Sequence, residues 1–357
     1  MKESKAGPQR SKSAGCLLAG LLLALCTACA GPVTRPASQL QWPPAPAVPK
    51  VSFVSEIRDL KDAGIQPGFW RHLLELVAGE TDQRIGRPYG VYLDPQGRLL
   101  IVDTVYNVVH VMDGLENSYT TIGQTVDGTV LKSPIGVTGD DSGNVYVTDS
   151  SVGMVYRYSF LDHTLTPFIQ TLQRPTGIAF SRRKRLLYVA DTVADRVAVF
   201  DLNGNARFSV GSTGSASGKL NHPTDLFIDD AGLLYITDPL NYRVQVFSAE
   251  GKFLRAFGTP GDADGEFLKP KGIAADSSGG IYVVDALSDT VKVYSPTGVF
   301  RFAFGSNGTE AGMFWQPSGV YIDRDDKIYV ADTYNRRVEI FQCIKAKTSE
   351  GKEEVIR

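Results

Sequence analysis

The sequence predicts an all-β chain folded as a six-bladed β-propeller with four antiparallel strands in each blade. A unit of about 47 residues occurs six times between Pro88 and Phe341, and each copy carries one aspartate in the same column. These aspartates are 46, 42, 47, 47 and 47 residues apart; they are Asp103, Asp149, Asp191, Asp238, Asp285 and Asp332. A period of this length with several short β-rich runs is typical of propeller blades, because one blade cannot bury its own apolar face.

Four strands can be placed within each unit. In the fifth unit they are predicted at 272–276, 281–284, 291–294 and 299–304, with glycine- and proline-containing turns between them. The runs are rich in Val, Ile, Tyr and Phe, as expected for strands packed on both faces between neighbouring blades. Five units open with Pro-x-Gly, and only Pro223-Thr224-Asp225 departs from this pattern.

The motifs of the unit are Pro-x-Gly-Ile, Gly-x-Ile-Tyr-Val-x-Asp and Asn-x-Arg-Val-x-Val-Phe. The last is most complete at Asn241–Phe247 and Asn335–Phe341. Together they resemble the NHL repeat of six-bladed propellers over about 250 residues. The resemblance is weakest in the first two units, where Val108 and Met154 replace the motif's arginine.

Closure of the ring requires a strand from outside the repeats. The sixth unit ends at Phe341 after its third strand, and the following tail, 343–357, is charged. Residues 50–57 alternate in polarity like the outer strands, so we predict that they pair with the third strand of the sixth unit. They begin a region, 50–86, that precedes the propeller at 87–342. The same region contains an expected helix at 67–78, whose apolar face caps the ring or docks a partner.

The N-terminus predicts export and lipid anchoring. Residues 1–28 combine four basic residues near the start with an apolar run, which is typical of a signal peptide. Leu25-Cys-Thr-Ala-Cys29 resembles a bacterial lipobox, and this resemblance implies lipidation of Cys29 and an outer-membrane anchor facing the periplasm, because Ala30 follows the cysteine. Ordinary secretion with cleavage near Ala28 or Ala30 is the alternative. Residues 29–49 are rich in proline and are predicted to form an extended tether.

Composition limits the partners. Without residues 1–28 the chain has 33 basic and 38 acidic residues, a net charge near −5, which argues against nucleic acid as a partner. Three of the four cysteines lie in or at the signal, so Cys343 has no partner for an intramolecular disulfide in the mature chain.

Candidate catalytic and metal-binding residues are few. The six repeated aspartates are expected to accept backbone N–H bonds, since a feature present in every blade favours a structural role. The segment Asn221–Leu226 resembles a metal-binding turn of six-bladed amidating lyases, but the equivalent positions of the other units are not histidines. A zinc site needs about three protein ligands. Calcium-dependent propeller lactonases and esterases are the other enzymatic relatives to consider, and they place Glu, Asn and Asp on inner strands near the axis. In this sequence Asp225 is the only acid in the six Pro-x-Gly positions. We therefore expect no catalytic residues, metal or cofactor.

The remaining functional hypothesis concerns one face of the ring, where the loops after each repeated aspartate meet the turns before each Pro-x-Gly. Aromatic and arginine side chains on such a face are typical of binding hot spots. The binding-face candidates are Arg87, Tyr89, Tyr106, Arg174, His222, Asp225, Lys269, Lys271, Trp315, Gln316, Tyr334 and Arg336. The sequence thus predicts a membrane-anchored, non-catalytic module that binds envelope proteins. The alternative is a metal-dependent hydrolase or lyase for a small extracytoplasmic substrate.

Overall fold

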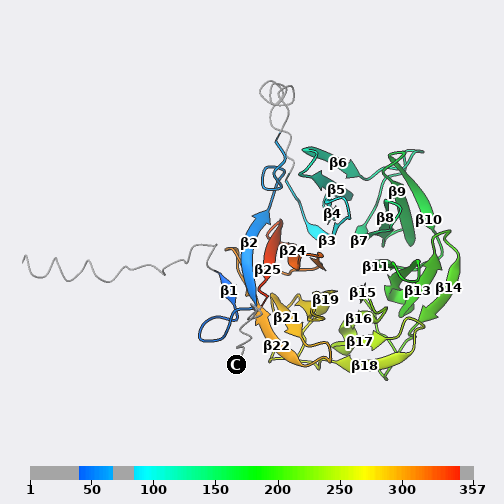
Figure 1. The fold of residues 1–357 in the computed structure, drawn as a ribbon. Coiled ribbons are helices and arrows are strands. Elements are labelled where there is room, and N and C mark those ends of the chain that lie inside the picture. Colours follow the sequence, from blue (N-terminus) through cyan, green and yellow to red (C-terminus); the bar gives the residue numbers. More distant parts are fainter. Residues whose placement is uncertain (1–39, 67–83, 346–357) are drawn as a thin grey trace, which may run out of the picture. The chain divides into compact units, whose positions relative to one another are not determined.

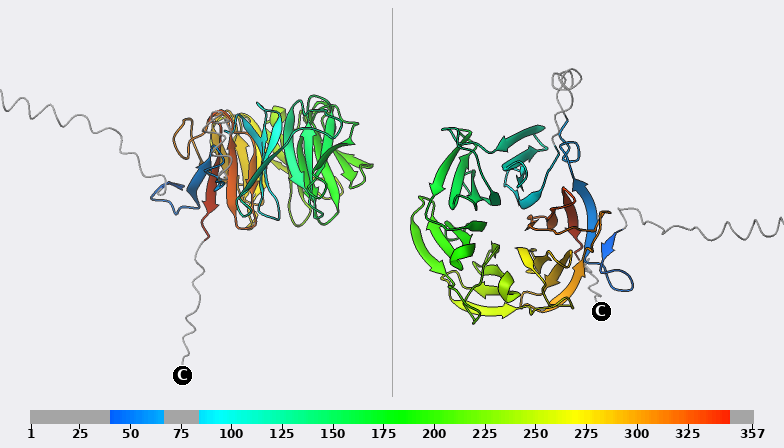
Figure 2. Two further views of the ribbon diagram at one scale, coloured as in Figure 1. Left: turned by 90° about the horizontal axis from the view of Figure 1, so that it is seen from above. Right: turned by 180° about the vertical axis from the view of Figure 1, so that it is seen from behind.

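The computed structural model describes residues 40–66 and 84–345, which form six β-sheets around one axis (Figure 1). Five sheets have four antiparallel strands and the sixth has five. Seen edge-on, the strands run between the two faces of the ring (Figure 2). The predicted six-bladed propeller is confirmed.

The strands follow the predicted order in every blade. Blades one to three contain β3 (Pro88–Leu93), β4 (Leu99–Asp103), β5 (Val108–Asp113), β6 (Ser118–Ile122), β7 (Pro134–Gly139), β8 (Asn144–Asp149), β9 (Met154–Ser159), β10 (Thr164–Ile169), β11 (Pro175–Ser181), β12 (Leu186–Asp191), β13 (Arg196–Asp201) and β14 (Ala206–Val210). Blades four to six contain β15 (Leu226–Ile228), β16 (Leu234–Asp238), β17 (Arg243–Phe247), β18 (Phe253–Phe257), β19 (Pro270–Ala275), β20 (Ile281–Asp285), β21 (Thr290–Tyr294), β22 (Phe300–Phe304), β23 (Val320–Ile322), β24 (Lys327–Asp332) and β25 (Arg337–Cys343). Short 3₁₀ turns follow two of the repeated aspartates, at Thr192–Ala194 and Pro239–Asn241.

The glycine of Pro-x-Gly is required by the close approach of the innermost strands. A Cβ atom on Gly90 would lie 2.5 Å from the carbonyl oxygen of Ile135 in the next blade, and one on Gly136 would lie 2.4 Å from that of Thr176. Because such contacts are shorter than van der Waals distance, a side chain there would push neighbouring blades apart. This repeated glycine therefore sets the spacing of the ring at its axis.

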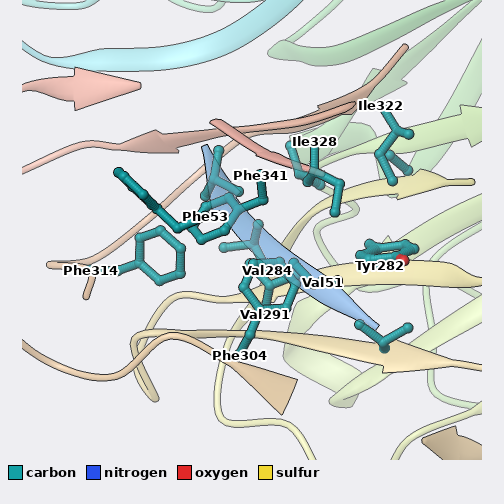
Figure 3. Packing of buried hydrophobic residues seen from close by; sticks show 14 residues of the cluster. Val51, Phe53, Tyr282, Val284, Val291, Phe304, Phe314, Ile322, Ile328 and Phe341 are labelled. Carbon is teal, nitrogen blue, oxygen red and sulfur yellow. The ribbon is translucent and has the colours of Figure 1, made fainter. Parts of the chain in front are cut away.

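The sixth blade is closed by a strand from the N-terminal side, as predicted. Strand β2 (Val51–Ile57) pairs antiparallel with β25, from Val51 opposite Cys343 to Ile57 opposite Val338. Phe53 packs edge-on against Phe341 with 5.6 Å between ring centroids, and Figure 3 shows Val51 and Phe53 within the core shared by the fifth and sixth blades. The pairing covers the edge of β25, which would otherwise be open to association with other chains.

A fifth strand in this blade differs from the expectation. The sequence predicts an extended tether over residues 29–49, yet within it β1 (Gln41–Trp42) pairs with β2 and extends the sheet outward. The Trp42 ring lies 5.8 Å from that of Phe341 and 6.1 Å from that of Phe304, measured between centroids. The many prolines of this segment favour an extended chain without pairing, but the packing of Trp42 on the two phenylalanine rings stabilises a two-residue strand. At the other end, Cys343 belongs to β25 rather than to the tail.

A buried ion cluster joins the closing strand to the repeats. The Arg337 guanidinium, 1% exposed, contacts Glu56 of β2 at 2.6 Å, Asp332 at 2.7 Å and Glu339 at 2.9 Å. Burial and the neighbouring Asp332 raise the pKa of Glu339 to about 8 despite the arginine. For Glu56, the bond from Arg58 and the charge of Arg337 outweigh burial and lower the pKa. Glu56 is thus the carboxylate that the closing strand contributes to the cluster.

Several sequence predictions concern residues outside the described ranges. These are the signal segment, lipidation of Cys29, the tether up to residue 39, the helix at 67–78 and the tail beyond residue 345. Within residues 40–66 and 84–345, no helix has the length and apolar character needed to span a bilayer.

Candidate functional site

The repeated aspartates join two sets of loops on one face of the ring. Each is fully buried at the end of the second strand of its blade. Asp103 accepts a 2.6 Å hydrogen bond from the Gly86 amide, and Asp149 accepts one of the same length from the Lys132 amide. The loop after each aspartate is thereby held against the segment that precedes Pro-x-Gly. We call the surface formed by these loops and segments the loop face.

A cation or histidine lies beside most of these aspartates. Nitrogen-to-oxygen distances are 3.1 Å for His110–Asp103, 3.2 Å for Arg196–Asp191, 2.9 Å for Arg243–Asp238, 3.0 Å for Lys292–Asp285 and 2.7 Å for Arg337–Asp332. Buried carboxylates with amide donors and an opposite charge are satisfied groups. The predicted structural role of the repeated aspartates is confirmed.

Every blade exposes one large apolar side chain on the loop face, two or three residues after its aspartate. These residues are between 40% and 53% exposed: Val105, Val152, Val193, Leu240, Leu287 and Tyr334. Tyr106, in the first blade, is exposed beside Val105. We call this set the apolar ring. Exposed apolar side chains scattered singly are normal, but a set at equivalent positions on one face points to a contact surface.

An aromatic and arginine cluster crosses the boundary between the sixth and first blades. The rings of Trp315 and Tyr334 lie 5.6 Å apart between centroids, and the Arg87 guanidinium carbon lies 5.1 Å from the centroid of Tyr334. All three side chains are exposed. Large rigid side chains with an adjacent arginine are the residue types that dominate binding energy in protein interfaces.

The inner part of the loop face is basic. Five exposed cations there have no carboxylate oxygen within 4.0 Å among the described residues: Arg87, Lys132, Arg174, Lys269 and Arg336. His222 is also exposed, but its Nδ1 lies 3.4 Å from Asp195. The net charge of the whole chain is −2, so the composition gives no sign of this local excess of positive charge. Composition alone therefore does not predict a basic face.

The ring encloses an axial cavity of about 890 Å³, lined by the innermost strands of all six blades. Tyr89, Asp225 and Lys271 line it at the end where these strands begin, which is the loop-face end. The structure therefore divides the twelve predicted binding-face residues into two groups. Three lie in the cavity, and nine lie on the loop face: Arg87, Tyr106, Arg174, His222, Lys269, Trp315, Gln316, Tyr334 and Arg336.

Asp225 and Lys271 are held in surroundings that favour a charge less than water does. Burial raises the pKa of Asp225 to about 7, although the Leu226 and Ile273 amides oppose the shift. Burial, with the charge of Lys269, lowers the pKa of Lys271 to about 8, and its ammonium lies 5.4 Å from the Tyr89 ring centroid. Burial and the charge of Asp225 raise the pKa of Tyr89 to about 12. Perturbed groups in a cavity are typical of ligand or catalytic sites.

Sequence reasoning missed Lys132 and most of the apolar ring. The signal was present, because aligning the units on the repeated aspartate puts an apolar residue two or three positions later in every unit. Its regularity is equally typical of a buried repeat position, and only the structure shows that these side chains are exposed on one face.

The described residues do not fit a metal centre on the axis. No group of three His, Cys, Asp or Glu side chains in this part of the chain is placed to hold an ion. Asp225 is in the cavity, but the exposed His222 is turned toward Asp195. A zinc ion requires about three protein ligands and calcium six or more oxygen ligands.

The fold defines the class of the protein as a six-bladed β-propeller, as the sequence predicted. The NHL repeat family matches residues 314–341, and the family described as SMP-30/Gluconolactonase/LRE-like region matches residues 134–264. The adipocyte plasma membrane-associated protein Hemomucin of Drosophila melanogaster is 27% identical over 146 residues, which cover 34% of this chain and 25% of Hemomucin. The similarity thus spans a quarter of that relative.

Solved structures with the same fold include lyases and binding proteins. The virginiamycin B lyase of Staphylococcus aureus with quinupristin has a TM-score of 0.56 and 15% identity, covering 74% of this chain and 97% of the lyase. An auxiliary nutrient binding protein of Bacteroides ovatus has a TM-score of 0.59 and 15% identity, covering 74% and 71%. A streptogramin B lyase has a TM-score of 0.56 and 12% identity, covering 74% and 82%. At these identities the likeness shows the fold alone.

Proposed function

We propose that the protein is a lipid-anchored, non-catalytic module of the cell envelope that binds another protein through its loop face. The apolar ring carries this proposal, since every blade exposes a large apolar side chain at the same place. A monomer gains nothing from exposing such groups, whereas a partner that covers them removes apolar surface from water.

The partner surface is expected to be apolar and acidic. The cluster of Trp315, Tyr334 and Arg87 supplies the kind of anchor found at interface hot spots. The five unpaired cations around the axis attract carboxylates, which raises the association rate and orients the partner. Binding should therefore weaken as salt concentration rises, because exposed charges are screened.

Anchoring places this interaction close to a membrane. The lipobox-like segment supports lipidation of Cys29, and the described fold begins at residue 40. The ten intervening residues can reach at most about 35 Å. Residue 40 would then lie within that distance of the membrane, and a partner on the loop face would be another protein of the same envelope.

A capture experiment tests the proposal. The full-length chain, with Trp315→Ala and Tyr334→Ala combined, is compared with the wild type for proteins retained from detergent-solubilised envelopes. The matched control combines Leu115→Ala and Leu161→Ala, which remove exposed apolar groups from turns at the opposite face. We expect a defined partner to be retained by wild type and control and lost from the loop-face variant. Equal retention by all three proteins would contradict the proposal.

An enzymatic function is the second candidate because the SMP-30/Gluconolactonase/LRE-like match spans the second, third and fourth blades. A metal-dependent hydrolase or lyase needs an ion that the described residues are poorly arranged to hold. Elemental analysis of zinc and calcium in protein purified without chelators separates the two candidates. A stoichiometric ion, lost from variants of His222 or Asp225, would favour the enzyme.

A further inference from the structure

Asp225 breaks the repeat at its most constrained position. Five blades carry glycine there, where neighbouring inner strands approach closely. In the fourth blade the carboxylate lies against Gly177 of the third blade, and one of its oxygens accepts a 3.2 Å hydrogen bond from the Ile273 amide of the fifth. A side chain placed where the fold otherwise excludes one points to a role other than ring formation.

Asp225 differs from the repeated aspartates in lacking a cation. No Lys, Arg or His nitrogen of the described residues lies within 4.0 Å of its carboxylate, although Lys271 lines the same cavity. Lys271 in turn makes no hydrogen bond or ion pair with a described residue, and its ammonium faces the Tyr89 ring. At the loop-face end of the cavity, one negative and one positive group thus lie close together without neutralising each other. This arrangement is costly unless something else pairs with both.

The cavity has the size and lining of a small-molecule site. Its volume of about 890 Å³ falls in the range of ligand pockets, roughly 300–1,000 Å³. Backbone and apolar groups of the inner strands line its middle, and Asp225 and Lys271 line its loop-face end. Seven further charged residues follow the ends of the inner strands at the opposite mouth: Arg182, Arg183, Asp229, Asp230, Asp276, Asp323 and Arg324. Such a composition allows a few polar contacts to orient a ligand.

We propose that the axial cavity binds a small zwitterion, such as an amino acid, whose ammonium group pairs with Asp225 and whose carboxylate pairs with Lys271. Tyr89 supports both contacts, since its ring faces the Lys271 ammonium and its phenol can donate to a ligand oxygen. The proposal does not depend on a protein partner at the loop face.

The test uses probes that differ only in charge pattern. Glycine, β-alanine and γ-aminobutyrate carry both charges at increasing separation, while butylamine and butyrate carry one each. Binding to the full-length, detergent-solubilised protein is measured by saturation-transfer NMR and calorimetry. We expect one zwitterion to bind at least about tenfold more tightly than either single-charge probe, because both contacts must form together.

Variants assign the two contacts. Asp225→Asn and Lys271→Met should each weaken the preferred zwitterion by about tenfold or more, and Leu161→Ala, at the opposite face, should leave binding unchanged. If Asp225→Asn fails to fold, Asp225→Gly restores the residue of the other blades and serves instead. Absence of binding by all three zwitterions at millimolar concentration would overturn the proposal. So would butyrate binding as tightly as the zwitterions and unaffected by Asp225→Asn.

Discussion

Two kinds of acid occur inside this ring: the repeated aspartates are fully buried, whereas Asp225 is half-buried at the axial cavity. The repeated Asp238 accepts hydrogen bonds from the Asn221 amide, the Asn241 and Gln245 side chains and the Arg243 guanidinium. Asp225 occurs once and accepts a hydrogen bond from the Ile273 amide, with no cation within 4.0 Å among the described residues. The comparison teaches that the acids in register with the repeat hold the blades together, as do Glu56 and Glu339 where the ring closes. Asp225, which breaks the register at the axis, has another role, and each kind of acid can be tested separately.

The largest effect should come from deleting residues 40–57. This removes β1, β2 and Glu56 together, uncovers the edge of β25 and exposes Phe341. We expect the thermal midpoint to fall by about 10 °C or more and aggregation to increase. The variant starts at residue 58, and a chain that starts at residue 40 is the control. Equal thermal midpoints of these two chains would show that β2 does not close the ring.

Next in size is Asp238→Asn, which tests a repeated aspartate. An asparagine offers one acceptor oxygen to the four donors and leaves Arg243 without its charge partner. Breaking a buried ion pair from one side costs about 3–5 kcal/mol. Urea unfolding measures this loss. A cost below about 1 kcal/mol would mean that the repeated aspartates are not the ring's main polar supports.

Glu56→Gln should have a smaller effect, near 1 kcal/mol, since it weakens one contact of Arg337 that lies partly in solvent. The lowered pKa of Glu56 gives the sign of its pH dependence. Its stabilisation is present above the ordinary glutamate pKa of 4.5 and is lost as pH falls through the lowered value. Wild type and variant should therefore unfold together in acid. A difference that persists below pH 3 would point to packing instead of charge.

Glu339→Gln should change the pH dependence of stability between mildly acidic and mildly alkaline pH. Because the pKa of Glu339 is raised in the folded state from the ordinary 4.5 to about 8, wild-type stability falls as pH rises from about 4.5 to about 8 and is level above that. The free energy of unfolding of the variant, relative to wild type, should therefore increase by at least about 1 kcal/mol between pH 5 and pH 8. Parallel unfolding curves at both pH values would show that Glu339 is ionised throughout.

Periodic features were the ones that the sequence could predict. The six blades, the satisfied aspartates and the closing strand at 50–57 follow from register, alternation and the unpaired edge of the sixth unit. Strand β1 could not be predicted, because its two residues are fixed by contacts between Trp42 and two phenylalanines distant in sequence. The division of candidates between loop face and cavity also needed the structure. Arg87 and Tyr89 are two residues apart, yet one is exposed and the other lines the axis.

The most direct test of the difference between the two kinds of acid is the thermal midpoint of Asp225→Asn at pH 5 and pH 8. If Asp225 is not a structural support, the thermal midpoint of the variant should not fall below that of wild type at either pH. The advantage of the variant should be larger at pH 8, because wild-type stability falls as pH rises from the ordinary aspartate pKa of 3.8 to the raised pKa of about 7. A loss at both pH values as large as that of Asp238→Asn would contradict the account and make Asp225 a seventh structural aspartate.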